Sequence, residues 1–525
     1  MHRSGISSSL RGLGLLLLAG CASDGVVEGQ DSDPETGSVT TASQALQQAT
    51  SCEDLLGRIQ ADAIAKLKAR VEELKEIDFD AKKGSAFGEP MLVGPMDTGV
   101  NSNNPGNPTN SGGRATAGVA PPASILVSAD DSMGHVSVLD GTSAAAEESA
   151  SHDVAYSETN QQVTGVDEAD IVKTDGRRVY VLHGDQLVVL DANPPSDTAL
   201  ALQAKIEGSP QEMFIHEDKV LVYSAVADPD QDTAKDCDEE VCRYDPEPYY
   251  HGGTGFTKMT VLDTSGETAQ VVREEYVEGS YVSARKHGSL ARGVIQGGFK
   301  APRIFDPSIE LRDVFGNPYS DAKIEAQLDS WQQRTQEDIE ATELSDWLPR
   351  RYTKADKDVE AKAPECTRYY VPAPGATEYG QTSIETVDLA VPNETVPGVI
   401  VLGNASQVYA NHDVLLLAQP DYWWTAGVED RERTALHLFK IEGEETPYVA
   451  SGYAPGVIHD QFSLDERNET VRLSSTQRVR GEDGMVERVN QVVTLRTEGE
   501  KLEVLGRSEE LAPGETIYST RFVGD

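Results

Sequence analysis

Short runs of β-branched and aromatic residues, separated by Gly, Asp and Asn, fill the chain from Tyr156 onward. Such runs predict strands, and Val179–Leu182 and Leu187–Leu190 flank a tight turn that predicts a hairpin. Further runs of this kind are 219–223, 259–263, 407–410, 414–417, 436–439, 471–474 and 492–495. No strict period relates them. A long series of hairpins needs an architecture that leaves few unpaired edge strands, such as a radial propeller or a barrel. The total length of the predicted strands is too great for a single sandwich.

Two segments have helical spacing instead. Within residues 49–80, apolar side chains recur on one face at Leu56, Ile59, Ala63, Leu67, Val71 and Leu74, which predicts an amphipathic helix to about Lys75. We expect it to dock on the rest of the chain; binding a partner is the alternative. Within 320–349, Ile324, Leu328 and Trp331 lie at i, i+4 and i+7, and Pro349 ends the pattern. This predicts a helical insertion in the strand-rich domain.

Apart from the predicted helix, the first 155 residues contain few apolar side chains that could form a hydrophobic core. Residues 1–20 have a basic start and an apolar stretch too short to cross a bilayer, and Leu18–Cys21 matches a lipobox. We therefore expect lipidation at Cys21, with an ordinary signal peptide as the alternative. Residues 21–48 and 81–155 have the low-complexity composition of a flexible tether and a linker. Ala22 and Ser23 follow Cys21, which favours outer-membrane sorting and an extracytoplasmic location.

Formal net charge is -43. This acidity argues against binding to nucleic acid and against electrostatic docking to anionic lipid. The membrane contact that we expect is therefore the lipid anchor. It leaves cation binding open. The sequence indicates no cofactor, with calcium as an alternative.

After Cys21, four cysteines remain, and an even number in an oxidising compartment predicts two disulfides. Three connectivities are possible. We favour Cys237–Cys242, which flank a short acidic loop, and then Cys52–Cys366, which would tie the N-terminal helix to the main domain. A metal site is the alternative, but there is no second close pair and no nearby histidine cluster.

The run Thr159–Gly176, TNQQVTGVDEADIVKTDG, resembles the opening signature of a secreted bacterial and archaeal family whose members carry a C-terminal β-propeller domain. Three later stretches are similar and follow in the family's order: Glu278–Arg285, Gly452–Glu466 and Gly514–Asp525. The resemblance covers residues 156–525 and implies an all-β propeller of antiparallel blades. It implies no catalytic residue, because no enzymatic activity is established for the family.

The last predicted strand, Thr516–Val523, is followed directly by Gly524 and Asp525. The resemblance implies further blades, so we expect a truncated chain and an incomplete ring. The alternative is closure of the ring by a strand from near the N-terminus.

Asp167, Glu168 and Asp170 place three carboxylates in four residues. We expect them to accept hydrogen bonds from turn amides or to pair with Lys173 or Arg285. Binding of a cation or other ligand is the alternative, although the spacing does not match an EF-hand. No HExxH or GxSxG motif occurs, so the sequence assigns no catalytic residue and no metal ligand.

These observations favour a non-enzymatic binding or scaffolding module for a protein, peptide or glycan at the cell envelope. The alternatives are an extracytoplasmic hydrolase that uses a propeller face and a calcium-stabilised structural domain.

Overall fold

The computed structural model describes residues 45–75, 161–230, 255–298, 321–355, 358–372, 380–394, 396, 398–421, 432–480 and 486–524. All of them belong to one compact unit, Ser43–Asp525. The predicted signal peptide, Cys21, the linker 81–155 and the pair Cys237 and Cys242 lie outside the described residues. Among the described residues, no helix has the length and apolar character that crossing a bilayer requires.

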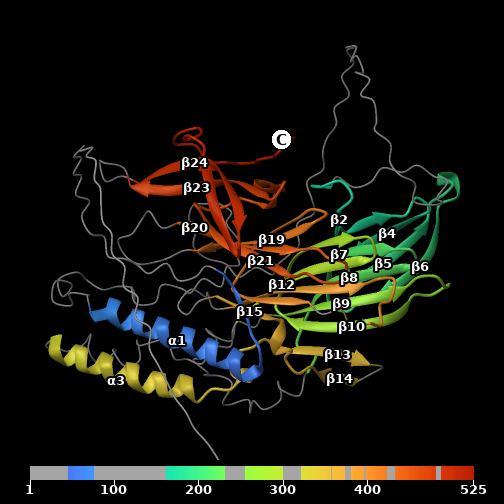
Figure 1. The fold of residues 1–525 in the computed structure, drawn as a ribbon. Helices are drawn as coiled ribbons and strands as arrows, with labels where there is room; N and C mark the ends of the chain where they lie inside the picture. The colour runs from blue at the N-terminus through green and yellow to red at the C-terminus, as the bar shows by residue number, and fades with distance from the viewer. Residues whose placement is uncertain are drawn as a thin grey trace, which may run out of the picture. The chain divides into compact units, whose positions relative to one another are not determined.

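Twenty of the described strands form five successive four-stranded antiparallel units, which we number blades 1 to 5 (Figure 1). Blade 1 consists of β3 (Val172–Thr174), β4 (Arg178–His183), β5 (Gln186–Asp191) and β6 (Ala199–Lys205), with the 3-10 helix η2 (Pro195–Asp197) before β6. Blade 2 consists of β7 (Ser209–His216), β8 (Lys219–Val226), β9 (Phe256–Asp263) and β10 (Gln270–Glu278).

Blades 3 to 5 complete this series. Blade 3 consists of β11 (Ser280–His287), β12 (Leu290–Gly297), β16 (Gln381–Asp388) and β17 (Val399–Leu402). Blade 4 consists of β18 (Gln407–Ala410), β19 (Val414–Asp421), β20 (Arg433–Lys440) and β21 (Tyr448–Pro455). Blade 5 consists of β22 (Leu464–Arg467), β23 (Thr470–Arg480), β24 (Val486–Glu498) and β25 (Lys501–Arg507), preceded by the 3-10 helix η8 (Gln461–Ser463).

Apolar layers between neighbouring blades form most of the core. Blades 1 and 2 share a layer around Tyr180 and Met213, and blades 2 and 3 share one around Tyr223 and Ile295. Two further layers join blade 3 to blade 4 and blade 4 to blade 5. First strands of neighbouring blades also touch, β3 with β7 and β11 with β18, which is the arrangement of a propeller in which the first strand of each blade lies innermost.

A hydroxyl–carbonyl contact recurs at three blade junctions. In blades 2, 3 and 4, the second residue of the third strand is a threonine, and its hydroxyl donates to the carbonyl of the glycine that follows the fourth strand. The pairs are Thr257–Gly279 (2.9 Å), Thr382–Gly403 (2.8 Å) and Thr434–Gly456 (2.8 Å). The sequence shows no strict period, because segments of different length separate these motifs.

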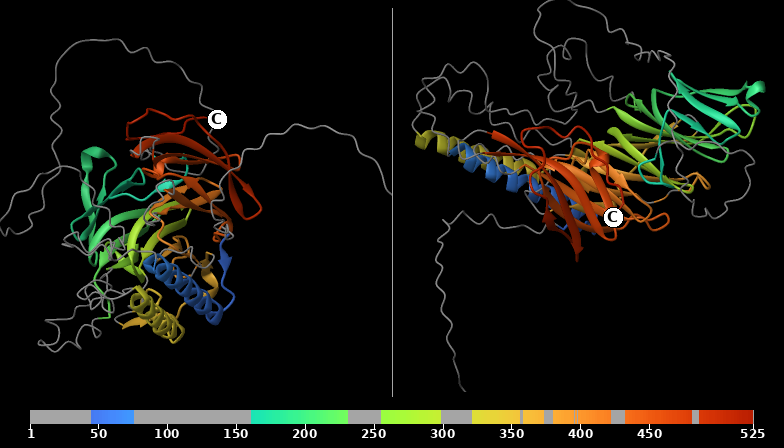
Figure 2. Two further views of the ribbon diagram at one scale, coloured as in Figure 1. Left: turned by 90° about the vertical axis from the view of Figure 1, so that its left-hand side faces the viewer. Right: turned by 90° about the horizontal axis from the view of Figure 1, so that it is seen from above.

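Both predicted helices are present. They are α1 (Cys52–Lys75) and α3 (Asp321–Glu340), which lie side by side and pack on blade 3 (Figures 1 and 2). Leu67 of α1, Leu328 and Trp331 of α3, and Ile400 of β17 share one buried cluster. The helix α1 thus docks on its own chain, as expected.

The insertion that contains α3 also extends the sheets of blades 2 and 3. It continues through the 3-10 helix η5 (Leu344–Asp346), β13 (Arg351–Ala355), β14 (Asp358–Ala361), the 3-10 helix η6 (Cys366–Arg368) and β15 (Tyr369–Val371). The strands β13 and β14 pair beside β10, and β15 pairs in parallel with β17.

One part of the predicted tether belongs to the fold instead. Gln47 and Gln48 form β1, which pairs with β15, and the neighbouring Ala45 and Leu46 are buried. The polar composition of residues 21–48 hid these two apolar side chains. Four residues after β1, Cys52 forms a disulfide with Cys366. This is the pairing considered from the sequence, and it joins the start of α1 to η6.

Gly279, at the junction of blades 2 and 3, provides a test of how closely the chain packs where it passes from one blade to the next. Gly279 has φ +142°, and a Cβ there would lie 2.5 Å from the carbonyl oxygen of Gln296. Gly288 has φ +59°, with no atom within 4 Å of such a Cβ. We expect Gly279→Ala to lower the free energy of unfolding by about 2–3 kcal/mol and Gly288→Ala by only about 1 kcal/mol in urea titrations. Equal losses would contradict the predicted steric role of Gly279.

Candidate functional site

The segment Gln161–Asp170, which we call the strap, contacts blades 2 to 5 before the chain enters blade 1. The side-chain amide of Gln162 donates to the carbonyl oxygens of Gln461 (2.9 Å) and Leu464 (3.2 Å), at the start of blade 5. The carbonyl oxygen of Thr164 lies 2.8 Å from Nε2 of His412, in the turn between β18 and β19 of blade 4. Near blade 2, Asp170 and Met213 form an isolated antiparallel bridge.

In its second half, the strap forms the short strand β2 (Asp167–Glu168), which pairs antiparallel with Arg285 and Lys286 of β11 in blade 3. The run Thr159–Gly176, which resembles the opening signature of the family, therefore contains two strands with different partners. The strand β3 begins blade 1, whereas the backbone of β2 pairs with a strand more than 100 residues further along the chain.

The acidic residues of the strap are balanced by cations of the same chain. Nζ of Lys173 lies 2.7 Å from Oδ1 of Asp167, and Nζ of Lys286 lies 3.4 Å from Oδ2. The guanidinium of Arg285 lies 3.9 Å from Glu168. Lys173, only 5% exposed, also lies over the ring of Phe214. The geometry therefore matches the expected pairing with Lys173 and Arg285, and it adds Lys286.

Asp170 is positioned differently from Asp167 and Glu168. Its carboxylate accepts a hydrogen bond from the amide of Ile171 (2.7 Å), and its backbone bonds to Met213. The three neighbouring carboxylates thus have separate partners. Among the described residues, no group of three or more His, Cys, Asp or Glu side chains is arranged to hold a metal ion.

A polar cavity of about 190 Å³ lies beside the strap. The start of blade 2, 3, 4 and 5 each contributes to its lining. The lining residues are Glu168, Ala169, Glu212, Val282, Ser283, Arg285, Ser406, Gln407, Val408 and Gln461. We call this cavity the strap pocket. Ser406 is exposed, so the pocket has a side that faces solvent.

β-Bulges aim two of the lining side chains into the strap pocket. The register of β7 shifts between Pro210 and Glu212, and that of β11 shifts between Tyr281 and Ser283. A bulge inserts one residue and re-aims the side chains that follow it, and bulges are common next to functional sites. Glu212 and Ser283 are the residues that follow the two shifts.

Arg285 is the central cation of the strap pocket, and it is only 3% exposed. Its guanidinium donates to the hydroxyl of Ser283 (2.7 Å), the carbonyl of Ala284 (2.8 Å) and the side-chain oxygen of Gln461 (2.9 Å). These bonds connect blade 3 to the start of blade 5. They also leave little of the guanidinium for a ligand.

Of the two carboxyl groups that line the strap pocket, Glu212 is the one whose negative charge is less well balanced by nearby groups. Burial raises its pKa, and the charges of Asp170 and Glu168 act in the same direction, while the hydroxyl of Tyr281 and the charge of Arg285 oppose them. Tyr281 donates to Glu212 at 2.6 Å. Burial and the neighbouring Glu212 also raise the pKa of Tyr281 well above its ordinary value.

The sequence pointed to Glu168 and Arg285 but missed Glu212, Ser283 and Gln461. A signal for two of them was present. Ser283 lies in Glu278–Arg285 and Gln461 lies in Gly452–Glu466, two of the stretches that resemble the family. The structure brings both of them to the strap, which is part of the run Thr159–Gly176. No comparable signal marks Glu212, because it is one polar residue in a strand.

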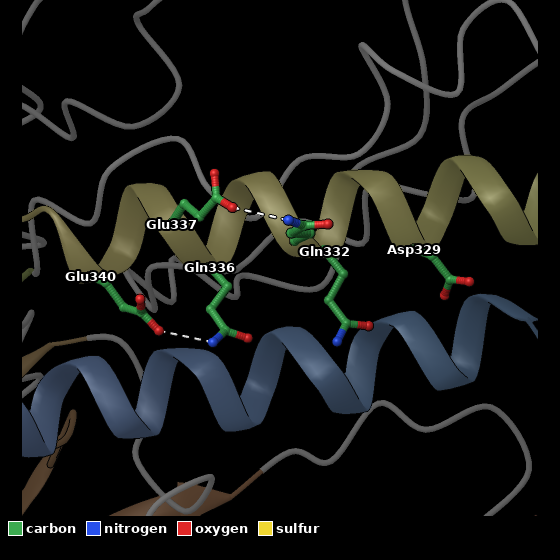
Figure 3. Close-up of a pocket in the computed structure, with 6 residues that line it drawn as sticks. Asp329, Gln332, Gln336, Glu337 and Glu340 are labelled. Atoms are coloured by element: carbon green, nitrogen blue, oxygen red, sulfur yellow. Dashed lines mark hydrogen bonds between the residues drawn. The ribbon is translucent and has the colours of Figure 1, made fainter.

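A second hollow, of about 370 Å³, lies along one helix (Figure 3). It is lined only by polar side chains of α3: Asp329, Gln332, Gln333, Gln336, Glu337 and Glu340. Gln336 bonds to Glu340 (2.8 Å) and Gln333 to Glu337 (3.1 Å), as is usual for residues four apart on a helix surface. Because one helix supplies all the residues, we regard the strap pocket as the better candidate.

The five antiparallel blades of the described residues, joined by apolar layers, define a β-propeller. A model of the family described as Beta propeller domain matches residues 156–525. The chain belongs to this family, and its fold is that of a generic binding or scaffolding module.

Individual relatives are distant. An uncharacterized protein of Archaeoglobus fulgidus is 33% identical over 84 residues, and the match covers 13% of each chain. Among solved structures, the N-terminal domain of Nup159 is 8% identical, covers 66% of this chain and 67% of its own, and has a TM-score of 0.21. A levansucrase complexed with sucrose is 10% identical, covers 69% and 90%, and also has a TM-score of 0.21.

The raised pKa of Glu212 gives a test of the strap pocket's electrostatics. A carboxyl whose pKa is higher in the folded state contributes stability below its unfolded pKa, and that contribution is lost as pH rises through the folded value. Glu212→Gln keeps an acceptor for Tyr281 but cannot ionise. We expect its melting temperature to exceed that of the wild type at pH 8 and the difference to vanish near pH 4. A lower melting temperature at pH 8 would contradict this assignment; exposed Glu503→Gln is the control.

Proposed function

We propose that this chain is an envelope-anchored, non-enzymatic binding module, and that a protein, peptide or glycan inserts a polar group into the strap pocket. The observation that carries the proposal is the convergence on one small cavity of the strap and of segments at the start of four blades. A site made of five separate segments holds its side chains in fixed relative positions, which favours recognition.

The chemistry of the lining supports binding over catalysis. Its polar side chains are carboxylates, amides, hydroxyls and one guanidinium, and neither histidine nor cysteine is among the lining residues. The hydroxyl of Ser283 accepts a hydrogen bond from Arg285, and among the described residues no hydrogen bond joins it to a carboxylate or a histidine. A serine without a general base is a weak nucleophile.

Photo-crosslinking tests where the partner contacts the chain. Benzoylphenylalanine replaces Gln407 in the strap pocket or, as a control, the exposed Lys501 of β25. With envelope extracts of the source cell, we expect a light-dependent adduct at position 407 and little at 501, measured by gel shift and mass spectrometry. Equal adducts at both positions, or none at 407, would contradict a binding role for this pocket.

The lipid anchor is proposed from the sequence, and it suits a binding module that must remain at the envelope. Cys21→Ser removes the thiol that would take the diacylglycerol. Acyl chains add about 0.8 kcal/mol of membrane affinity per buried CH₂, so their loss should release the protein. We expect wild-type chain in the membrane fraction with incorporated labelled palmitate, and the variant in the soluble fraction without label. Unchanged membrane association of Cys21→Ser would overturn the anchor.

A further inference from the structure

We propose that the strap pocket binds a primary ammonium group of a peptide, and that the group is the side chain of a lysine. This inference rests on the proposed function, because it names the chemistry of the ligand for the same pocket.

The first support is the distribution of charge in the strap pocket. Two carboxylates, Glu168 and Glu212, share the lining with one cation, Arg285. Because the guanidinium donates to Ser283, Ala284 and Gln461, it is occupied by acceptors of its own chain. The pocket therefore offers acceptors and a net negative charge to a ligand, which is the complement of an ammonium group with its three donors.

The second support is the hydrogen bonding and ionisation of the Glu212 carboxyl group. One of its oxygens accepts the hydrogen bond from Tyr281, and its other oxygen accepts none from the described residues. The nearby Asp170 and Glu168 disfavour its ionisation, as does burial. An ammonium group beside this oxygen would offset all three effects, because a nearby cation favours the charged form of a carboxyl.

The third support is the size and composition of the strap pocket. A volume of about 190 Å³ is below the roughly 300–1,000 Å³ of sites for drug-sized ligands, so it suits one side chain. No aromatic residue is among the lining residues, so the pocket has no face on which a sugar ring could stack. The net charge of -43 would also raise the local concentration of a basic partner.

The test uses the full chain and three capped or partly capped peptides. The first is acetyl-Gly-Lys-Gly-amide, the second is the same peptide with an Nε-acetyl-lysine, and the third is Gly-Ala-Gly-amide with a free amino terminus. Calorimetric titrations at low salt are made with the wild type, Glu212→Gln and Glu503→Gln. The two variants remove the same charge, and Glu503 lies exposed on β25.

We expect the lysine peptide to bind the wild type, more weakly as salt or acidity increases, and the Nε-acetylated peptide to give no heat. Glu212→Gln should weaken binding about tenfold or more, because it removes one partner of a desolvated charge pair. Glu503→Gln should leave the Kd within about twofold, as expected for an exposed charge. Glu168→Gln provides a second variant, with a loss in the same direction.

Several outcomes would overturn the inference. Equal effects of Glu212→Gln and Glu503→Gln would mean that the acidic surface as a whole attracts the peptide. Preference for the free amino terminus would keep the ammonium chemistry but exclude the lysine side chain. Binding of the acetylated peptide, with the crosslink at position 407 retained, would leave the proposed function intact and refute the ligand. No binding and no crosslink would refute both.

Discussion

The apolar layers between blades are the interaction on which the rest of this structure depends. Each blade has two faces, and each described layer covers a face of two blades at once, although the parallel pairing of β21 with β25 joins blades 4 and 5 into one sheet. Between blades 2 and 3, the aromatic side chains Phe214 and Tyr223 meet the small Ala284 and Ala291. At Gly293 a Cβ would lie 2.7 Å from the ring of Tyr223, so the ring fits only because that side chain is absent. Burying one such aromatic side chain contributes about 1.5–3 kcal/mol.

Where the strap contacts the blades, polar contacts take the place of the apolar layers. There the half-buried strap crosses the sheets and bonds to several blades. Its contacts include the bonds from Gln162 to blade 5, the strand β2 on blade 3 and the bridge at Asp170 on blade 2. An unpaired buried charge would be costly, which explains why the buried Lys173 lies against Asp167. The strap pocket is the space that this polar layer leaves open.

A third element ties the N-terminal part of the chain to the propeller. The buried carboxylate of Glu385 receives two hydrogen bonds from Arg351 (2.7 and 2.6 Å) and one from Arg368 (3.1 Å). Burial alone would raise the pKa of Glu385, but the two guanidinium groups hold it below its ordinary value. Arg368 belongs to η6, as does Cys366, whose disulfide to Cys52 spans 314 residues. Closing so long a loop stabilises a fold mainly by restricting the unfolded chain.

The sequence by itself determined the local structure and the kind of fold. Strand runs such as 407–410 and 436–439, the helical spacing of Leu67 and Val71, and the family-like stretches were sufficient, because periodicity and turn residues act over a few positions. Tertiary structure alone decided that Asp167 and Glu168 pair with blade 3, that Gln47 and Gln48 extend it, and that Glu212 and Gln461 share a cavity with Arg285. These contacts join positions up to hundreds of residues apart. They depend on how the blades stack, and no pattern within a short window of the chain records that.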